Sequence, residues 1–272
     1  MTTAALPLPA ARAAFPTFLA DSAQIALRHV RALVRQPWYV AITLVQPIIW
    51  LLLFGQLFSR VVDIPGFATG SYVSFLAPGV VVMTALYSSG WSGMGYIIDI
   101  ERGVMDRMLA APVRHGAIML GNLLYGAGVI VIQSLVIIGL GTVAGARFPG
   151  GPLAVVMLLV ASMLLGAAFA SYSNALALLL RSQESVIGVV NLLVLPLSFL
   201  SPVFMPQDLL PGWMKHVADF NPVSWAVAVG RESLHSNVDW AVVLGHTALL
   251  LALACVVGWL STRAFRAYRR SM

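Results

Sequence analysis

Long apolar segments constrain this chain more than any other feature of its sequence. Six segments are close to, or longer than, the about 20 residues that a helix needs to cross about 30 Å of hydrocarbon, and none has a formal charge in its middle. Only 10% of the 272 residues are charged, against about 25% in an ordinary soluble domain. We therefore predict an all-α integral membrane protein with a single transmembrane domain, residues 1–272. The six expected transmembrane helices cover residues 38–58, 73–97, 116–145, 153–180, 186–204 and 241–261.

The distribution of arginine predicts how these helices are oriented. Of the 16 Lys and Arg residues, twelve fall on one side of the six helices and four on the other. Cytoplasmic loops retain Lys and Arg, so we expect the richer side and both termini in the cytoplasm, with the chain in the cytoplasmic membrane. Residues 1–22 lack the order of a secretory signal and are expected to be a flexible, uncleaved tail, and residues 262–272 a basic tail. The four residues expected outside are Arg60, Arg147, Lys215 and Arg231.

A basic amphipathic helix is expected over residues 23–37. At about 100° per residue, Arg28, Arg31 and Arg35 fall on one face, with apolar residues opposite, and Pro37 ends the helix. Such a helix lies in the membrane interface, with its apolar face in the lipid bilayer and its arginines against anionic headgroups. The alternative is a helix that packs on a soluble partner protein.

The segment between the fifth and sixth transmembrane helices, residues 205–239, is broken by prolines into pieces too short to span the membrane. Its tryptophans favour a position at interfacial depth. We expect short helices that enter the outer leaflet and return, with their broken backbone covered by protein. A plain extracellular loop is the alternative. The prolines and tryptophans that support this prediction are Pro206, Pro211, Pro222, Trp213, Trp225 and Trp240.

The residue pattern argues against catalysis by this chain. The five histidines are scattered singly, and neither a metal-ligand spacing nor a nucleophile motif occurs, so we expect no catalytic or metal site. A phosphate-binding P-loop needs a lysine, and the only lysine, Lys215, lies in the sequence LLPGWMK. Any energy from a nucleotide must therefore come through another polypeptide.

One strongly charged stretch, ERGVMDRMLAAPVRHG at residues 101–116, separates the second and third transmembrane helices. Its four charged residues after Glu101 would cost about 10–14 kcal/mol near the centre of a bilayer, so the stretch stays in the cytoplasm. Residues 101–111 are expected to form a short helix. One of its faces is an apolar arc of Val104, Met105, Met108 and Leu109, and Pro112 ends the helix after little more than two turns. A helix this short is unstable alone, which favours a protein partner over a simple connecting loop.

The same stretch resembles the membrane subunits of ABC type-2 exporters. These carry Glu-Arg/Lys-Gly-Thr, then Glu/Asp-Arg, then Pro-X-Arg between the second and third transmembrane helices. Here the pattern reads Glu101-Arg102-Gly103-Val104, Asp106-Arg107 and Pro112-Val113-Arg114, with Val104 in place of the usual threonine. Asn221-Pro222 followed by Arg231 matches a second family motif before the last transmembrane helix. The resemblance extends over nearly the whole chain.

This resemblance implies a permease without its own ATPase site. It implies two cytoplasmic ABC ATPase subunits that hold ATP and Mg²⁺, a second permease copy or paralogue, and export of a drug-like molecule, lipid or glycolipid; no nucleic acid is expected as a partner. Residues 101–114 would be the coupling helix that contacts an ATPase subunit. The alternative is a membrane scaffold or assembly factor that recruits a cytoplasmic partner without transport. The implied coupling residues are Glu101, Arg102, Gly103, Asp106, Arg107, Met108, Pro112 and Arg114.

Overall fold

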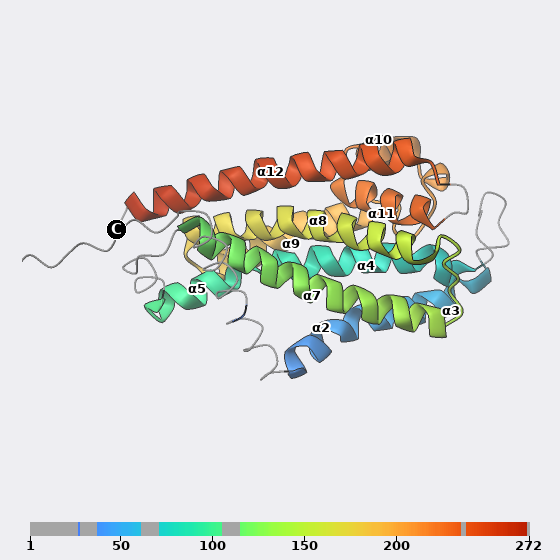
Figure 1. Cartoon of the computed structure of the whole chain (residues 1–272), viewed down its shortest axis with the longest axis horizontal. Helices are drawn as coiled ribbons and strands as arrows, with labels where there is room; N and C mark the ends of the chain where they lie inside the picture. The colour runs from blue at the N-terminus through green and yellow to red at the C-terminus, as the bar shows by residue number, and fades with distance from the viewer. Residues whose placement is uncertain (1–26, 28–36, 61–70, 105–114, 235–237, 271–272) are drawn as a thin grey trace, which may run out of the picture.

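The computed structural model describes residues 27, 37–60, 71–104, 115–234 and 238–270, and within these ranges the chain forms helices and no strand (Figure 1). The helices run side by side as one elongated bundle. Their bounds are α2 (Pro37–Ile49), the π-helix η1 (Trp50–Phe54), α3 (Gly55–Leu57), α4 (Tyr72–Gly90), α5 (Gly93–Glu101), α7 (His115–Val143), α8 (Gly151–Leu180), α9 (Gln183–Phe199), the 3-10 helix η3 (Gln207–Leu209), α10 (Gly212–Asp219), α11 (Pro222–Ser233) and α12 (Trp240–Arg270).

Four of the expected transmembrane helices are long and apolar enough to cross a bilayer, over Tyr72–Glu101, Met119–Val143, Gly151–Leu180 and Trp240–Ala267. The other two correspond to shorter apolar helices, Ala41–Leu57 and Gln183–Phe199. The first of these contains Pro47 and continues as the π-helix η1, and the second ends three residues after Pro196. The chain is therefore a multi-pass membrane protein.

The C-terminal basic segment differs from the expected tail. The helix α12 continues to Arg270 instead of ending near residue 261. Arg263 lies with its guanidinium carbon 3.9 Å from the centre of the Trp259 ring, one turn earlier, and this cation–π contact favours a continued helix. Residues 262–270 thus extend the last helix beyond its apolar part.

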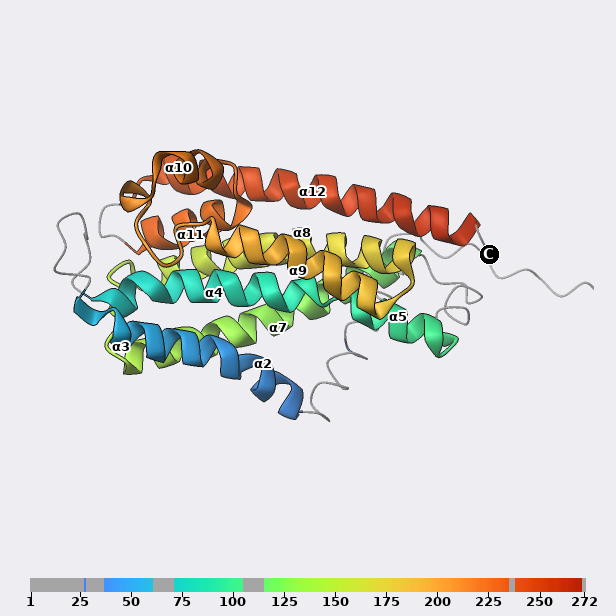
Figure 2. The same cartoon turned by 180° about the vertical axis from the view of Figure 1, so that it is seen from behind.

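The helix α8 lies at the centre of the bundle, where α4, α7, α11 and α12 pack against it (Figures 1 and 2). Its buried face is rich in small residues, which let helix backbones approach closely in a membrane. A Cβ atom at Gly166 would meet the Ile130 side chain of α7, and Ala170, one turn later, is buried too. The small-residue pattern of α8 is therefore a packing surface.

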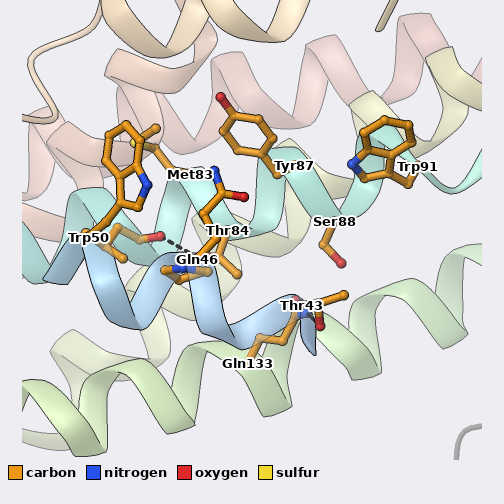
Figure 3. Close-up of a pocket in the computed structure, with 11 residues that line it drawn as sticks. Thr43, Gln46, Trp50, Met83, Thr84, Tyr87, Ser88, Trp91 and Gln133 are labelled. Atoms are coloured by element: carbon orange, nitrogen blue, oxygen red, sulfur yellow. Dashed lines mark hydrogen bonds between the residues drawn. The ribbon is translucent and has the colours of Figure 1, made fainter. Parts of the chain in front are cut away.

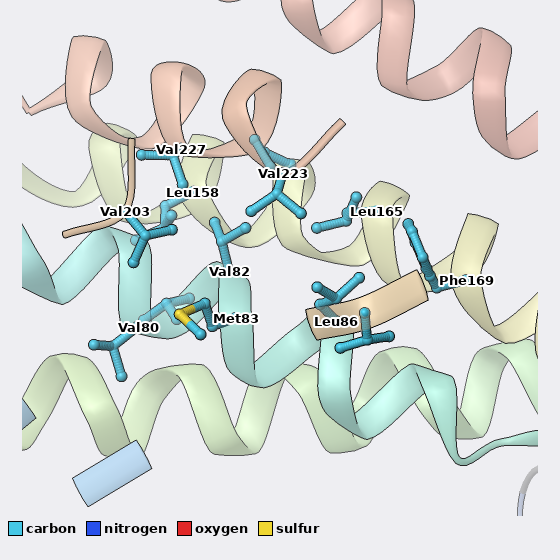
Figure 4. Packing of buried hydrophobic residues seen from close by; sticks show 14 of the residues in the cluster. Val80, Val82, Met83, Leu86, Leu158, Leu165, Phe169, Val203, Val223 and Val227 are labelled. Atoms are coloured by element: carbon cyan, nitrogen blue, oxygen red, sulfur yellow. The ribbon is translucent and has the colours of Figure 1, made fainter. Parts of the chain in front are cut away.

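Apolar side chains from α4, α8, α11 and the segment between α9 and α11 fill the middle of the bundle (Figure 4). Leu86 of α4 and Leu165 of α8 are completely buried, as are Val203, Val223 and Val227. Branched side chains at these positions occupy the space between three helices. This core fixes α4 and α11 against α8.

A short break separates α4 from α5, where a single transmembrane helix was expected over 73–97. The hydroxyl of Ser173, on α8, donates to the Gly90 carbonyl at 2.5 Å and accepts from the Gly93 amide at 3.0 Å. These two groups would otherwise lose partners at a helix end, which is costly inside a membrane. Ser173 therefore holds the end of α4 and the start of α5 together. Gly93 has no room for a side chain, because a Cβ atom there would overlap the Ser173 carbonyl oxygen.

We predict that Gly93→Ala destabilises the protein by about 1–3 kcal/mol, because a methyl group would force α5 away from α8. The matched control is Gly95→Ala in the same helix, where a Cβ atom meets nothing within 4 Å. That change should be neutral or stabilising by up to about 1 kcal/mol, since alanine favours a helix. Unfolding by sodium dodecyl sulfate in mixed micelles, followed by circular dichroism, gives both values. Equal stability of the two variants would show that α5 is not closely packed on α8.

Candidate functional site

The helix α5 ends at Glu101, and the chain then turns at Arg102 and Gly103. Gly103 has φ of +64°, a left-handed conformation that glycine adopts without the strain of a side chain. This conformation explains why a glycine follows Glu101-Arg102. The expected coupling residues Asp106, Arg107, Met108, Pro112 and Arg114 lie outside the described residues, so of this set the structure places Glu101, Arg102 and Gly103.

Glu101 is exposed, yet it is bound to another part of the bundle. Both oxygens of its carboxylate accept from the Gln183 side-chain amide, at 3.2 Å each. Gln183 is the first residue of α9, and Ser182 before it caps that helix by accepting from the Ser185 amide at 3.4 Å. The contact therefore ties the end of α5 to the start of α9. Sequence reasoning missed Gln183, which is 82 residues away from Glu101.

The end of α5 and the C-terminal end of α12 lie at the same end of the bundle, whereas α3, α10 and α11 lie at the opposite end (Figures 1 and 2). The expected interfacial helix cannot be placed in this arrangement. Arg28, Arg31 and Arg35 lie outside the described residues, and the first described helix, α2, begins at Pro37.

The segment between α9 and α12 contains the two short helices α10 and α11. The helix α11 packs on α8, α4 and α12, and its apolar residues Val223, Ala226, Val227 and Val229 are completely buried. The segment between the fifth and sixth transmembrane helices therefore contains short helices, as expected. Its second helix is part of the bundle core rather than an extended loop.

Asn221 and Pro222 begin α11. The Asn221 side chain accepts from the Val223 amide at 2.9 Å and so caps the helix. Its amide nitrogen donates to the carbonyls of Leu197 and Leu200 at 2.8 and 3.1 Å. Carbonyls at a helix end lack partners within that helix, so Asn221 joins the start of α11 to the end of α9.

Arg231, near the end of α11, also binds backbone carbonyls. Its guanidinium group donates to the Val203 carbonyl at 2.8 Å and to the Phe75 carbonyl at 3.4 Å. The guanidinium carbon lies 3.6 Å from the centre of the Phe75 ring, a cation–π distance. Asn221 therefore binds the end of α9, and Arg231 binds the segment that follows it.

Two adjoining cavities lie within the chain. The smaller one, about 130 Å³, lies between α2, η1, α4 and α7. Figure 3 shows Trp50 and Trp91 at its two ends, with Thr84 and Tyr87 of α4 between them. The larger one, about 490 Å³, lies between the α4–α5 break, α7 and α8. Most residues in its wall are small or apolar, and Asn122 is a polar exception. Ser88 and Trp91 line both cavities.

Comparison with known proteins adds two kinds of finding. Residues 23–234 match the family model described as ABC-2 type transporter. The daunorubicin resistance ABC transporter permease protein DrrB1 of Streptomyces coeruleorubidus is 32% identical over 212 residues, which are 76% of this chain and 73% of that protein. Nodulation protein J of Rhizobium meliloti strain 1021 is 29% identical over 198 residues, 72% of this chain and 74% of that protein.

We predict that Asn221→Ala destabilises the protein by about 2–4 kcal/mol, because it removes a helix cap and leaves two carbonyls without their donor. Asn191→Ala on α9 is the control, since Asn191 takes no part in this junction, and it should cost less than about 1 kcal/mol. The measurement is the free energy of unfolding in mixed micelles. If the two variants lose the same stability, Asn221 does not hold α9 and α11 together.

Proposed function

The chain belongs to the ABC-2 type transporter family, and we propose a mechanism by which it links ATP hydrolysis to export. It is the permease subunit of an ABC-2 exporter and associates with ABC ATPase subunits. ATP is bound and hydrolysed by those partner subunits and not by this chain.

In our proposal, two ATPase subunits and two permease chains, identical or paralogous, form the transporter. Residues 101–114 form the coupling segment that contacts an ATPase subunit, and this segment begins with the turn at Arg102 and Gly103. The observation that carries this assignment is the pair of hydrogen bonds between Glu101 and Gln183. A force on the segment after Glu101 reaches α5 through the chain and α9 through this contact.

The break between α4 and α5 lets this force become a movement. A continuous helix would transmit it along its whole length, whereas a break allows α5 to tilt against α4. Ser173 bonds both sides of the break and is held on the central helix α8. We therefore assign the contact between Gly93 and Ser173 as the pivot on which α5 moves when the ATPase subunits close.

The proposed arrangement in the membrane has six transmembrane helices with both termini in the cytoplasm. Supporting it, the end of α5 and the C-terminal end of α12 share one end of the bundle (Figure 1). Arg102 directly follows α5, and Arg263 and Arg266 lie in the last turns of α12, as expected for a cytoplasmic side rich in arginine. The helices α10 and α11 enter the outer leaflet from the other side. The basic segment with Arg28, Arg31 and Arg35 lies in the cytoplasmic interface.

The proposed substrate is an amphipathic drug-like molecule, a lipid or a glycolipid. One supporting fact is that the similar protein DrrB1 is named for daunorubicin resistance. Another is that the described cavities are lined by apolar and neutral polar side chains. Such walls suit an amphipathic molecule better than a bare ion.

The orientation can be tested by labelling single cysteines with a reagent that cannot cross the membrane. In a Cys255→Ala background, Ala110→Cys and Ala267→Cys should react only from the cytoplasmic side, and Leu210→Cys only from outside. Intact cells and inside-out vesicles are compared. Labelling of position 267 from outside would contradict the arrangement with six helices.

The coupling role is tested by the double variant Glu101→Ala with Met108→Asp. It removes the bond to Gln183 and places a charge on the apolar arc, where contact with the ATPase would leave that charge unpaired. Recovery of the ATPase with the permease, or ATP-driven export in vesicles, should fall about tenfold or more, which corresponds to about 1.4 kcal/mol of lost interaction.

The control for this test is Glu184→Ala, since Glu184 is an exposed carboxylate nearby whose side chain accepts from Ser182 within its own turn. Both variants are compared with the wild type at equal abundance in the membrane. Normal assembly and normal export by the double variant would contradict the coupling role. Normal assembly without any ATP-dependent transport, even by the wild type, would favour the scaffold alternative.

A further inference from the structure

We propose that the two adjoining cavities form a single binding site inside one permease chain, for an uncharged molecule that joins a hydroxylated aromatic ring to an apolar body. The ring occupies the smaller cavity, where Gln133 hydrogen-bonds its hydroxyl group, and the body occupies the larger cavity. This inference rests on the proposed export function for its biological role. It deepens that function by naming the substrate class and the residue that recognises it.

Gln133, in the middle of α7, is the residue that points to a ligand. Its side chain is 1% exposed and lines the smaller cavity. The amide nitrogen donates to the Thr43 hydroxyl at 3.0 Å, whereas the amide oxygen has no hydrogen-bond partner among the described residues. With the amide turned over, the nitrogen would be the unpaired atom instead, so one polar atom is unsatisfied in either orientation. Buried polar atoms are normally paired, and a ligand hydroxyl can both donate and accept.

Aromatic side chains give this cavity its preference for a ring. Trp50, Tyr87 and Trp91 line it (Figure 3). The Trp50 ring is held in place, with its centroid 5.1 Å from that of Phe54 in a stacked pair and 5.2 Å from that of Phe204. Aromatic rings attract one another at such distances, so an aromatic ring of a ligand would make favourable contacts with the rings that line this cavity.

The backbone of the cavity wall is unusual in the same place. Trp50 begins the π-helix η1, which spans Trp50–Phe54 and follows Pro47 by three residues. Short π-helical segments inside α-helices occur frequently at functional sites. Here the wider turn coincides with the wall formed by Trp50 and Pro47.

The cavity volumes determine the shape of the ligand. The smaller cavity, about 130 Å³, is close to the about 150 Å³ of an apolar cavity that admits one benzene molecule. The larger cavity, about 490 Å³, falls within the range of about 300–1,000 Å³ for sites of drug-sized ligands. Because Ser88 and Trp91 line both, one molecule can place a ring in the first and its body in the second.

The polarity of the cavity walls determines which chemical groups the ligand can carry. Within the described part of the chain, no Asp, Glu, Lys or Arg lines either cavity. A formal charge on the ligand would be desolvated without a partner, which is strongly unfavourable. In the wall of the larger cavity the Asn122 amide donates to the Ser92 hydroxyl at 3.3 Å, and a neutral polar group of the ligand can join this hydrogen-bonded pair.

The position of Trp91 connects this site to the proposed pivot. Trp91 immediately follows α4 and belongs to the break before α5. A tilt of α5 about the contact between Gly93 and Ser173 therefore moves the wall that the two cavities share. Movement of this wall provides a route by which closure of the ATPase subunits releases the ligand.

The test measures binding of tritiated 17β-estradiol, an uncharged phenol ring joined to a rigid apolar body, to the complete transporter in lipid nanodiscs without ATP. The paired ligand is its 3-methyl ether, which cannot donate a hydrogen bond from the ring. Empty nanodiscs give the partition into lipid. Wild type should bind estradiol saturably, at one molecule per permease chain, and bind the ether more weakly.

Three variants separate the parts of the site. Gln133→Leu should weaken estradiol binding about fivefold to tenfold, with less than about a twofold effect on the ether, because only estradiol loses a hydrogen bond. Gly126→Leu fills the larger cavity from a position where a Cβ atom meets nothing within 4 Å, so it should weaken both ligands. The control Asn191→Leu removes an amide from α9, outside both cavities, and should leave both affinities unchanged.

Equal estradiol affinity in Gln133→Leu and Asn191→Leu would overturn the inference, as would binding that merely follows the amount of lipid. If Gln133→Leu does not assemble, Trp50→Leu replaces it and should weaken both ligands. The variant Glu101→Ala with Met108→Asp should bind estradiol like wild type. Normal binding without ATP-driven export would contradict the export function alone, and normal export of other compounds without estradiol binding would contradict this site alone.

Discussion

Close packing against α8 holds the helices of this bundle together. In a bilayer the lipid is as apolar as the helices, so helix association rests on tight contact and on hydrogen bonds between helices. The α8 face meets both demands: Gly166 and Ala170 let neighbours approach, and Ser173 bonds both ends of the α4–α5 break. Because α4, α5, α7, α11 and α12 all contact this helix, it is the fixed element against which other helices can move.

Sequence patterns predicted the long helices because their physical causes are local. Length, hydropathy and the absence of charge determine whether a segment can cross a membrane, and α7 and α8 lie within two residues of their expected bounds. The break at Trp91 escaped prediction since the residues next to it, Ser88 to Gly93, include no charge and no proline. The contact that holds the break comes from Ser173, about 80 residues further along the chain. The helical continuation through Arg270 was missed because charge was taken to end the helix together with the membrane.

Some functional residues could be predicted from the sequence, whereas the groups that they bind could not. The motif residues Glu101, Asn221 and Arg231 could be found from their pattern, but their partners Gln183, Leu197 and Val203 are backbone or amide groups without any sequence signal. Gln133 lies in an apolar segment of α7, and its sequence context does not distinguish it from an amide that only packs between helices. Its importance depends on an unpaired atom, a neighbouring cavity and the aromatic ring of Trp50, and these require three helices to be placed together. Long-range polar contacts are thus the part of this site that a sequence does not reveal.

In the proposed mechanism, α5 moves against α8 when the partner ATPase closes. It is tested most directly by a distance measurement between spin labels at Ile98→Cys on α5 and Leu179→Cys on α8, in the assembled transporter with Cys255→Ala. Double electron–electron resonance is recorded without nucleotide and with ATP and vanadate, beside a control pair at Leu153 and Leu179 within α8. Movement on the Ser173 pivot predicts a shifted distance for the first pair and none for the control. If the distance between positions 98 and 179 is the same without nucleotide and with ATP and vanadate, α5 does not move against α8.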